Sequence, residues 1–460
     1  MPPIHVVILA AGKGTRMKSV RPKVLHRVAG RPMVEYVLKA TRTLAPKTTT
    51  MVIGYQADAL TASLAGCHDL TFVVQEPQLG TGHALLAAEK ALQSATGTLV
   101  LVSGDVPLLS ADTLKTLVER HLTSGAAATV LTATLPDPQG YGRIIRSGEQ
   151  IARIVEDKDA SAIERAICEI NAGVYAFALD GLFDAVRSIA SENAQKEYYL
   201  PDLVGMYRRG GRGVEAVPVG RPEEILGINT RRDLAEVSRI VREAKSRELM
   251  AAGVTVEDPQ TTYVDDSVQI GADTIIHPCV FLEGDTTIGA ACEIHSGVRI
   301  VDSRIGDRVT VNNHSVITAA TIENDASVGP FAHLRNQAVV SERARVGNFV
   351  EMKKTVLGRG SRAMHLSYLG DAIIGGDVNV GAGTITCNYD GVQKHTTTIE
   401  EGAFIGSDTQ LIAPVKVGKG AYVGTGATIR EDVPPGALAV SAGKQRNIEG
   451  WVARKDKRRK

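Results

Sequence analysis

The C-terminal half of the chain repeats an aliphatic residue every six positions, often with glycine directly after it. Five-residue steps reset this phase at Ile305 and again at Ile322. A period of six fits neither an α-helix nor a flat strand, and it predicts a left-handed parallel β-helix of hexapeptide repeats. Three hexads would close one coil, and the periodic side chains would point inward and stack from coil to coil. The three runs are Ile270, Ile276, Leu282, Ile288, Ile294 and Ile300; Ile322, Val328, Leu334, Val340, Val346 and Met352; and Ile399, Ile405, Leu411, Val417, Val423 and Ile429.

The first 228 residues instead alternate short β-rich runs with segments of helical spacing. Strands are expected at 6–10, 50–53, 70–75 and 99–103, and helices at 32–44, 82–93 and 112–122. This alternation predicts an α/β domain with a Rossmann-like, mainly parallel sheet. Ligands of such sheets bind where strands end, so the loops after Ala10, Gln75 and Ser103 are the places to look for chemistry.

The two patterns divide the chain into four parts. Residues 1–229 form the α/β domain, and 230–251, which contain no Gly or Pro, form a helical linker. The β-helix then occupies about 252–437, which is roughly ten coils at eighteen residues each. Residues 438–460 are a C-terminal tail. An insertion from Cys387 to Thr398 breaks the hexad phase, and such loops usually lie on the functional face of a solenoid.

Composition excludes several classes of protein. The formal net charge of +1 gives no reason to expect a nucleic acid or another large polyanion as partner, and the basic run 454–460 is interpreted as a solvated tail. Five cysteines without a CxxC pair argue against a disulfide framework. Residues 4–11 are expected to be a first strand rather than a signal peptide, and no segment is long and apolar enough to cross a membrane. A cytoplasmic enzyme follows.

The first strand runs directly into a loop suited to phosphate. Gly12 and Gly14 let backbone amides approach a phosphate group, Arg16 offers a fork of donors, and Lys23 follows nearby. The spacing matches neither a Walker A loop nor a dinucleotide fingerprint. Taken alone, the GxG could equally be an ordinary tight turn.

Motifs along the whole chain carry a more specific resemblance. The sequences LAAGKGTRM at 9–17, LGTGH at 79–83 and SGD at 103–105 resemble the sugar-1-phosphate nucleotidylyltransferases. Further motifs at 140–144, 154–158, 169–173 and 227–229, with 349–354, 365–370 and 381–390 in the β-helix, are similar to one family within them. That family comprises the bifunctional N-acetylglucosamine-1-phosphate uridylyltransferases / glucosamine-1-phosphate N-acetyltransferases.

The resemblance implies a uridylyl-transfer site in the α/β domain, with UTP as co-substrate. Arg16 and Lys23 would offset phosphate charge, and Asp105 with Asn229 would bind Mg²⁺, which prefers oxygen ligands. The implied nucleotide-binding residues are Leu9, Ala11, Gly12, Lys23, Gln75, Gly80 and Thr81. The implied sugar-phosphate residues are Gly142, Glu156, Asn171, Tyr199 and Asn229.

The resemblance also implies an acetyl-transfer site on the β-helix, with His365 as general base and acetyl-CoA as co-substrate. An imidazole can take the amine proton while nitrogen attacks the thioester. The implied sugar-phosphate residues are Arg335, Lys353, Tyr368, Asn379, Asn388 and Lys394. The implied acetyl-CoA residues are Ala382, Asn388, Tyr389, Ser407 and Thr425.

The chain departs from the family pattern at three positions. Ser103 stands where the family commonly has Tyr, Asn336 where it has Pro, and Ala442 where it has an Arg that contacts CoA.

Four histidines, at 277, 295, 314 and 333, recur every 18 or 19 residues and suggest a ladder of zinc ligands. Their positions relative to the core aliphatics differ, so they should not all stack in one column. That weakens an alternative in which the β-helix resembles a carbonic anhydrase.

Two further alternatives stay open on the residues alone: a single-activity nucleotidylyltransferase with a structural or regulatory β-helix, and a β-helix that serves only as a scaffold. His365 and the phase-breaking loop favour the two-site enzyme. The resemblance implies a homotrimer that acts on small molecules.

Overall fold

The computed structural model describes residues 2–441, 443, 445, 447–452 and 454, which fall into two compact units. These units are Met1–Val241 and Arg242–Lys460. The division lies within helix α8 (Arg231–Ala251). Two features noted in the sequence, Ala442 and the basic residues 455–460, lie outside the described residues.

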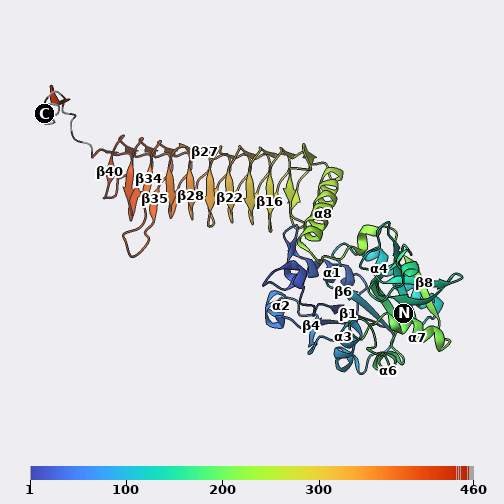
Figure 1. Cartoon of the computed structure of the whole chain (residues 1–460). Helices are drawn as coiled ribbons and strands as arrows, with labels where there is room; N and C mark the ends of the chain where they lie inside the picture. The colour runs from blue at the N-terminus through green and yellow to red at the C-terminus, as the bar shows by residue number, and fades with distance from the viewer. Residues whose placement is uncertain (1, 442, 444, 446, 453, 455–460) are drawn as a thin grey trace. The chain divides into compact units, whose positions relative to one another are not determined.

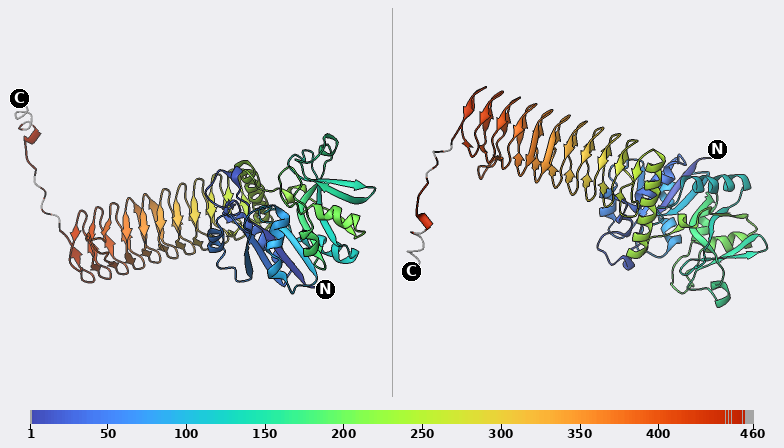
Figure 2. Two further views of the ribbon diagram at one scale, coloured as in Figure 1. Left: turned by 60° about the horizontal axis from the view of Figure 1, so that its bottom comes forward. Right: turned by 90° about the horizontal axis from the view of Figure 1, so that it is seen from above.

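The N-terminal unit is built on one twisted nine-stranded sheet (Figures 1 and 2). Its main path runs in the order β11 (Val214–Pro218), β7 (Ala128–Thr134), β10 (Glu169–Ala178), β6 (Thr98–Ser103), β1 (Ile4–Leu9), β4 (Thr48–Ile53) and β5 (Leu70–Val74). Only β10 on this path runs antiparallel to its neighbours, and β8 (Arg143–Ser147) with β9 (Gln150–Val155) forms a hairpin attached to it. The prediction of a mainly parallel α/β sheet is confirmed.

Helices cover the sheet where the sequence predicts them, with one difference. The segment 82–93 is not one helix, because α3 (Thr81–Ala87) ends early and a short 3₁₀ helix (Glu89–Leu92) follows. The other two predicted helices are α1 (Met33–Arg42) and α4 (Ala111–Ser124). The unit also contains α2 (Ala57–Ser63), α5 (Ala162–Arg165), α6 (Leu182–Arg187) and α7 (Asp202–Arg209).

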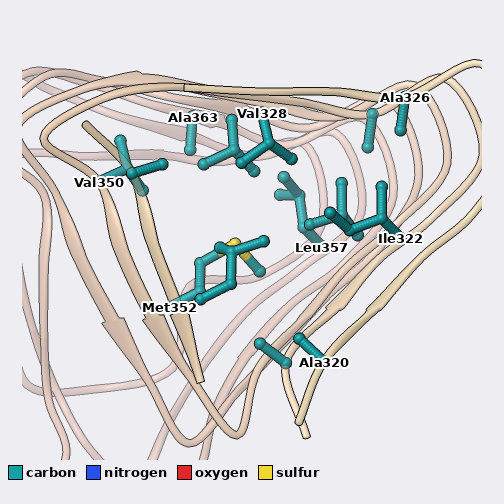
Figure 3. Close-up of a cluster of buried hydrophobic side chains, with 14 of the residues drawn as sticks. Ala320, Ile322, Ala326, Val328, Val350, Met352, Leu357 and Ala363 are labelled. Atoms are coloured by element: carbon teal, nitrogen blue, oxygen red, sulfur yellow. The ribbon is translucent and has the colours of Figure 1, made fainter. Parts of the chain in front are cut away.

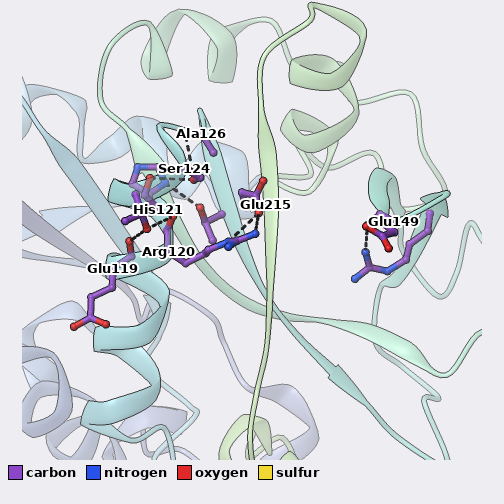
Figure 4. Close-up of polar contacts among 10 residues, drawn as sticks. Glu119, Arg120, His121, Ser124, Ala126, Glu149 and Glu215 are labelled. Carbon is purple, nitrogen blue, oxygen red and sulfur yellow. Dashed lines mark hydrogen bonds and ion pairs between the residues drawn. The ribbon is translucent and has the colours of Figure 1, made fainter.

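Helix α4 is fixed to the sheet by polar contacts as well as by its apolar face (Figure 4). Ser110 caps its N-terminus by accepting from the amide of Thr113 at 3.1 Å. Arg120 donates from Nη2 to Glu215 on β11 at 2.6 Å, and the buried ring of His121 lies 3.0 Å from the hydroxyl of Thr129 on β7. Burial of that ring lowers the pKa of His121 to about 4, so the imidazole is neutral at physiological pH.

The second unit is a β-helix of three parallel sheets whose strands are two to four residues long (Figure 1). We refer to them as the first, second and third sheets. The first runs from β12 (Thr255–Val256) to β41 (Leu438–Ala439), the second from β13 (Tyr263–Val264) to β40 (Thr428–Ile429), and the third from β14 (Gln269–Ile270) to β38 (Val415–Val417).

The hexad aliphatics fill the interior of this β-helix, as predicted (Figure 3). Val328 and Met352 are fully buried, and of the three runs only Ile270, in the third sheet near the start of the β-helix, is partly exposed. Glycine often follows the aliphatic because the coils approach closely there. A Cβ added at Gly271 would lie 2.6 Å from the backbone nitrogen of Ala290 on the next coil.

Helix α8 contributes side chains to both cores. Val237 and Val241 belong to a core of the N-terminal unit, whereas Leu249 belongs to the core of the β-helix. Within the described residues, no helix combines the length and the apolar character needed to cross a membrane.

Candidate functional sites

The loop after β1 brings Lys23 close to the end of the strand. Gly14 adopts φ +58°, and a Cβ there would lie 2.7 Å from the Cβ of Lys23. A side chain at position 14 would therefore be strained and would push Lys23 away. Parallel pairing of Leu9 with Ser103 places the loop after β6, which carries Asp105, beside this position.

Four predicted site residues meet there. The ammonium of Lys23 forms an ion pair with Asp105 and donates to Asn229 Oδ1 at 3.2 Å. Arg16 donates from Nη2 to the same Asn229 oxygen at 2.9 Å. The carboxylate of Asp105 and the amide oxygen of Asn229 thus face the same cation, and such a pair of oxygen donors fits Mg²⁺.

A cavity of about 410 Å³ opens beside this cluster. Asp105 and Ser103 lie on its wall, together with Gln78 and Glu197, which the sequence did not single out. All seven predicted nucleotide-binding residues line it: Leu9, Ala11, Gly12, Lys23, Gln75, Gly80 and Thr81.

The buried side chain of Gln75 already has a hydrogen-bond partner within the protein. Its Nε2 donates to the carbonyl of Gly80 at 3.0 Å, so it shapes the loop that carries Gly80. Gly80 has φ +103°, and a Cβ there would lie 2.8 Å from the carbonyl oxygen of Tyr198. Gln78 ties this wall to the loop after β1, because its Nε2 donates to the Ala11 carbonyl at 2.8 Å.

A second cavity of about 210 Å³ shares Leu9, Thr81, Ser103 and Asp105 with the first. Four of the predicted sugar-phosphate residues line it: Gly142, Glu156, Asn171 and Asn229. The fifth, Tyr199, does not line it; its buried side chain accepts at the hydroxyl from Gln195 at 2.8 Å. Two ligands bound in these cavities would meet at Asp105.

Glu156 lines this second cavity, and the pKa of its carboxyl is shifted. Burial, followed by the charges of Asp202 and Asp159, raises the pKa of Glu156 to about 7. The group is therefore present in both forms near neutral pH. An ionised carboxylate accepts hydrogen bonds, and a protonated carboxyl can also donate one.

Asn171 is oriented by a bulge in β10. The strand register shifts between Asn171 and Tyr175, and Gly173 has φ +69° within the bulge. The Asn171 side chain accepts from the Gly173 amide at 3.0 Å and donates to the Tyr175 hydroxyl at 2.6 Å. Tyr175 also lines the cavity, and no sequence pattern indicates this because a bulge has no period.

On the β-helix, His365 ends β30 (Arg362–His365) and is exposed. Its Nδ1 lies 2.9 Å from Oδ1 of Asn348, the paired residue on the coil before. Nδ1–H therefore donates to Asn348, which leaves the lone pair on Nε2. Sequence reasoning missed Asn348, although it lies 17 residues before His365, one coil away.

His365 belongs to one column of the β-helix. Each member stands two residues after an inward aliphatic of the first sheet, on successive coils from Val346 to Val423. The column is Asn348, His365, Ala382, Ser407 and Thr425. The predicted base and three predicted acetyl-CoA residues therefore lie on one edge, between the first and second sheets.

A group of cationic side chains lies at the opposite edge of the second sheet, between the second and third sheets. Arg335 in β25 (His333–Arg335) pairs with Lys353 in β28 (Glu351–Lys353). Contact with Lys394, then desolvation and the charges of Lys394 and Arg335, lowers the pKa of Lys353, because a second cation disfavours the charged form. Glu351 balances part of this charge by accepting from Arg335 at 2.6 Å.

Lys394 comes from the phase-breaking loop, which has its own internal order. Tyr389 and Lys394 form an antiparallel bridge, and Asp390 accepts from the amides of Val392 and Gln393 at 2.8 and 2.7 Å. These amides, and the ring of His395, hold the pKa of Asp390 well below its usual range. The loop is a compact hairpin that protrudes from the stack (Figure 1).

Four more predicted residues lie in this part of the β-helix. Buried Asn388 donates to Asp371 at 2.5 Å and anchors the base of the loop, while the Tyr389 side chain is 60% exposed. Tyr368 begins β31 (Tyr368–Gly370) on the second sheet, between the two edges. Asn379 begins β33 (Asn379–Val380) on the first sheet and pairs with Phe404 of β36 (Phe404–Ile405).

The four histidines do not share one column, as the sequence predicts. His277 and His295 stack with ring centroids 4.6 Å apart, whereas His314 stacks on Phe331 at 5.2 Å and His333 lies in β25.

The fold and its cavities define a class of protein in which an α/β nucleotidyltransferase domain is followed by a hexapeptide-repeat β-helix. Three family models match accordingly: a MobA-like NTP transferase domain at residues 6–173, a GMPPB C-terminal domain at 259–356, and bacterial transferase hexapeptide repeats at 396–431.

Relatives match over nearly the whole chain. The bifunctional protein GlmU of Pelobacter propionicus is 48% identical over 99% of this chain and 99% of its own length. That of Trichlorobacter lovleyi is 49% identical over 98% of both chains. The chain belongs to the GlmU family of bifunctional proteins.

Proposed function

We propose that this chain makes UDP-N-acetylglucosamine in two steps at two separate sites. The β-helix transfers acetyl from acetyl-CoA to the amine of glucosamine-1-phosphate. The N-terminal unit then couples the product to UTP and releases pyrophosphate. The observation that carries this proposal is the meeting of a nucleotide-sized cavity and a smaller cavity at Asp105, in a chain that also presents a histidine base on a hexapeptide β-helix.

In uridylyl transfer, the phosphate oxygen of N-acetylglucosamine-1-phosphate attacks the α-phosphorus of UTP. Asp105 and Asn229 would hold Mg²⁺, which supplies charge neutralisation at the phosphates. Lys23 lines the first cavity, and Arg16 donates to Asn229, which lines the second. These positions support a role for both cations in stabilising charge on the phosphate oxygens.

In acetyl transfer, Nε2 of His365 takes the amine proton as the nitrogen attacks the thioester carbonyl. Asn348 fixes the tautomer that makes Nε2 the acceptor. The proton then returns to the leaving CoA thiolate. Arg335, Lys353 and Lys394 would bind the sugar phosphate, since three cations at one corner suit a doubly charged group.

We propose a homotrimer in which neighbouring copies complete the acetyl site. His365 and Gly370, the residue that pairs with Lys353, are five residues apart along one coil, a contour length of roughly 16 Å at the rise of a strand. They lie at opposite edges of the second sheet, and this supports a site in which the base of one copy serves the phosphate site of another. Between two copies, the edge of one β-helix meets the opposite edge of the next.

An exposed apolar ridge beside His365 supports this arrangement. It consists of Phe331, Phe349 and Leu366, which are 48, 54 and 64% exposed, on successive coils. The two phenylalanine rings stack at 5.4 Å. Contiguous apolar side chains of this size at one edge suit burial against another copy of the chain.

We assign 1–229 to uridylyl transfer, 230–251 to a helical linker, 252–437 to acetyl transfer and 438–460 to a tail. We also place both reactions in the cytoplasm, in keeping with five cysteines that form no disulfide in the described residues.

The test uses purified full-length protein with glucosamine-1-phosphate, acetyl-CoA, UTP and Mg²⁺. One CoA and one pyrophosphate should appear for each UDP-N-acetylglucosamine, and without UTP the product should stop at N-acetylglucosamine-1-phosphate. If pyrophosphate forms only from supplied N-acetylglucosamine-1-phosphate and no CoA is released, the β-helix has only a structural or regulatory role.

A further inference from the structure

Three neighbouring coils at the start of the β-helix bring together histidine and glutamate side chains that neither proposed reaction uses. Val256, Ile276 and Ile294 pair in register in the first sheet, and the residue after each faces outward. These residues are Glu257, His277 and His295. The rings of His277 and His295 stack 4.6 Å apart with their planes 6° from parallel.

A single carboxylate oxygen lies close to the Nε2 atoms of both rings. Glu293 Oε1 is 3.2 Å from Nε2 of His277 and 3.5 Å from Nε2 of His295. The other nitrogen of the His277 ring, Nδ1, lies 2.9 Å from Oε2 of Glu257. A neutral imidazole has one N–H, so if Nδ1–H donates to Glu257, the Nε2 lone pair of His277 points at an acceptor.

A cation bound by both the Nε2 lone pair and the Glu293 oxygen would make this contact between two acceptors favourable. We propose that His277, Glu293 and His295 form a binding site for a divalent transition-metal ion such as Zn²⁺ or Co²⁺. Ligand atoms around tetrahedral zinc lie roughly 3.3 Å apart, which follows from zinc–nitrogen and zinc–oxygen distances of about 2.0–2.1 Å. The two distances to Glu293 Oε1 match that spacing, and the ligand atoms of all three residues lie within 4.8 Å of one another.

The surroundings fit a metal site as well. Glu257 holds Nδ1 of His277, which is the usual carboxylate–histidine–metal arrangement and presents Nε2 to the ion. The three ligands are partly exposed, so a water molecule or an anion can take the fourth position. Imidazole nitrogens favour zinc or cobalt over magnesium, so this site is chemically distinct from Asp105 and Asn229.

The ion would link successive coils where the β-helix begins. A ligand that binds only the folded state stabilises it, so metal should raise the melting temperature of the protein.

The experiment uses the full-length chain after dialysis against EDTA, with Co²⁺ as the probe. One Co²⁺ per chain should bind with the visible absorption of tetrahedral cobalt, and Zn²⁺ should displace it. His277→Ala/His295→Ala should lose that absorption, and Glu257→Gln should weaken binding about 10–100-fold.

Three variants serve as controls that should bind as wild type: His333→Ala, another exposed histidine of the β-helix; Cys279→Ser, an exposed thiol nearby; and Asp105→Ala. Binding that persists in the double histidine variant, or that disappears with Cys279→Ser, overturns the site. So does a wild-type melting temperature that Zn²⁺ leaves unchanged, because the cluster would then consist only of histidine–glutamate ion pairs.

Discussion

The two proposed active sites differ in how much of each a single chain supplies. In the N-terminal unit, the two cavities and the proposed metal ligands meet around Asp105. On the β-helix, the base and the cationic group occupy opposite edges of the second sheet. In a parallel sheet, the carboxyl ends of neighbouring strands lie side by side, so the loops that follow them can form one site. In a three-sided β-helix, the loops lie at separate corners that face away from one another. In the proposed trimer, a neighbouring copy would enclose the substrate at this site.

This contrast predicts that point changes separate the two activities. The largest loss should follow from His365→Ala, which removes the proposed base. Acetyl transfer should fall about 10²–10⁴-fold and uridylyl transfer should stay unchanged. Separate assays of CoA and pyrophosphate release check this. A parallel loss of both activities with the melting temperature would instead assign His365 a packing role.

Asp105→Ala should act in the opposite unit. Removing the carboxylate ligand should lower Mg²⁺-dependent pyrophosphate release by about 10³-fold, since a bound metal contributes several kcal/mol to transition-state stabilisation. Acetyl transfer should remain near wild type. Uridylyl transfer that resists EDTA in the wild-type protein would contradict the metal assignment.

Asn348→Ala should have a smaller effect, because Asn348 orients the base without touching substrate. We expect acetyl transfer to fall about 10-fold, as for the loss of one orienting hydrogen bond of about 1.4 kcal/mol. Asn348→Asp keeps an acceptor for Nδ1–H and should restore most of the rate. A rate unaffected by Asn348→Ala would show that the tautomer is set by another group.

Glu156 predicts a pH effect confined to the uridylyl site. Its pKa of about 7 lies above that of a free carboxyl, so the folded protein holds the proton more tightly. Stability from this group is complete at acid pH and is lost as pH rises through about 7. Glu156→Gln should therefore melt higher than wild type at pH 8 and match it in acid.

The same variant should alter substrate affinity. Ionised Glu156 is the better acceptor for sugar hydroxyls, so the wild-type KM for N-acetylglucosamine-1-phosphate should fall a few-fold as pH rises through about 7. In Glu156→Gln that dependence should disappear. An unchanged pH profile in the variant would exclude Glu156 from sugar binding.

The sequence predicted most of the features that depend on a periodic pattern or on a short motif. The hexad aliphatics other than Ile270 are buried as expected, and the glycine-rich loop lies beside Lys23 and Asp105. It could not predict Asn348, because coil register depends on the five-residue steps. Nor did it predict the bulge that places Tyr175 in the second cavity, since the cause of that bulge is a local break in strand pairing.

The roles of the individual site residues stay predictions. The geometry of Tyr199 gives the least support to its predicted role in sugar binding. Its hydroxyl accepts a hydrogen bond from Gln195, and its side chain does not line the second cavity.

The shared acetyl site is tested most directly by mixing two inactive variants. His365→Ala and Lys353→Ala/Lys394→Ala would be co-expressed with different tags, and trimers that carry both tags would be purified. In every such trimer, one of the three interfaces joins an intact base to an intact cationic group, so about a third of wild-type acetyl transfer should return. Mixed trimers without acetyl transfer would show that base and phosphate site come from the same copy, which would contradict this account.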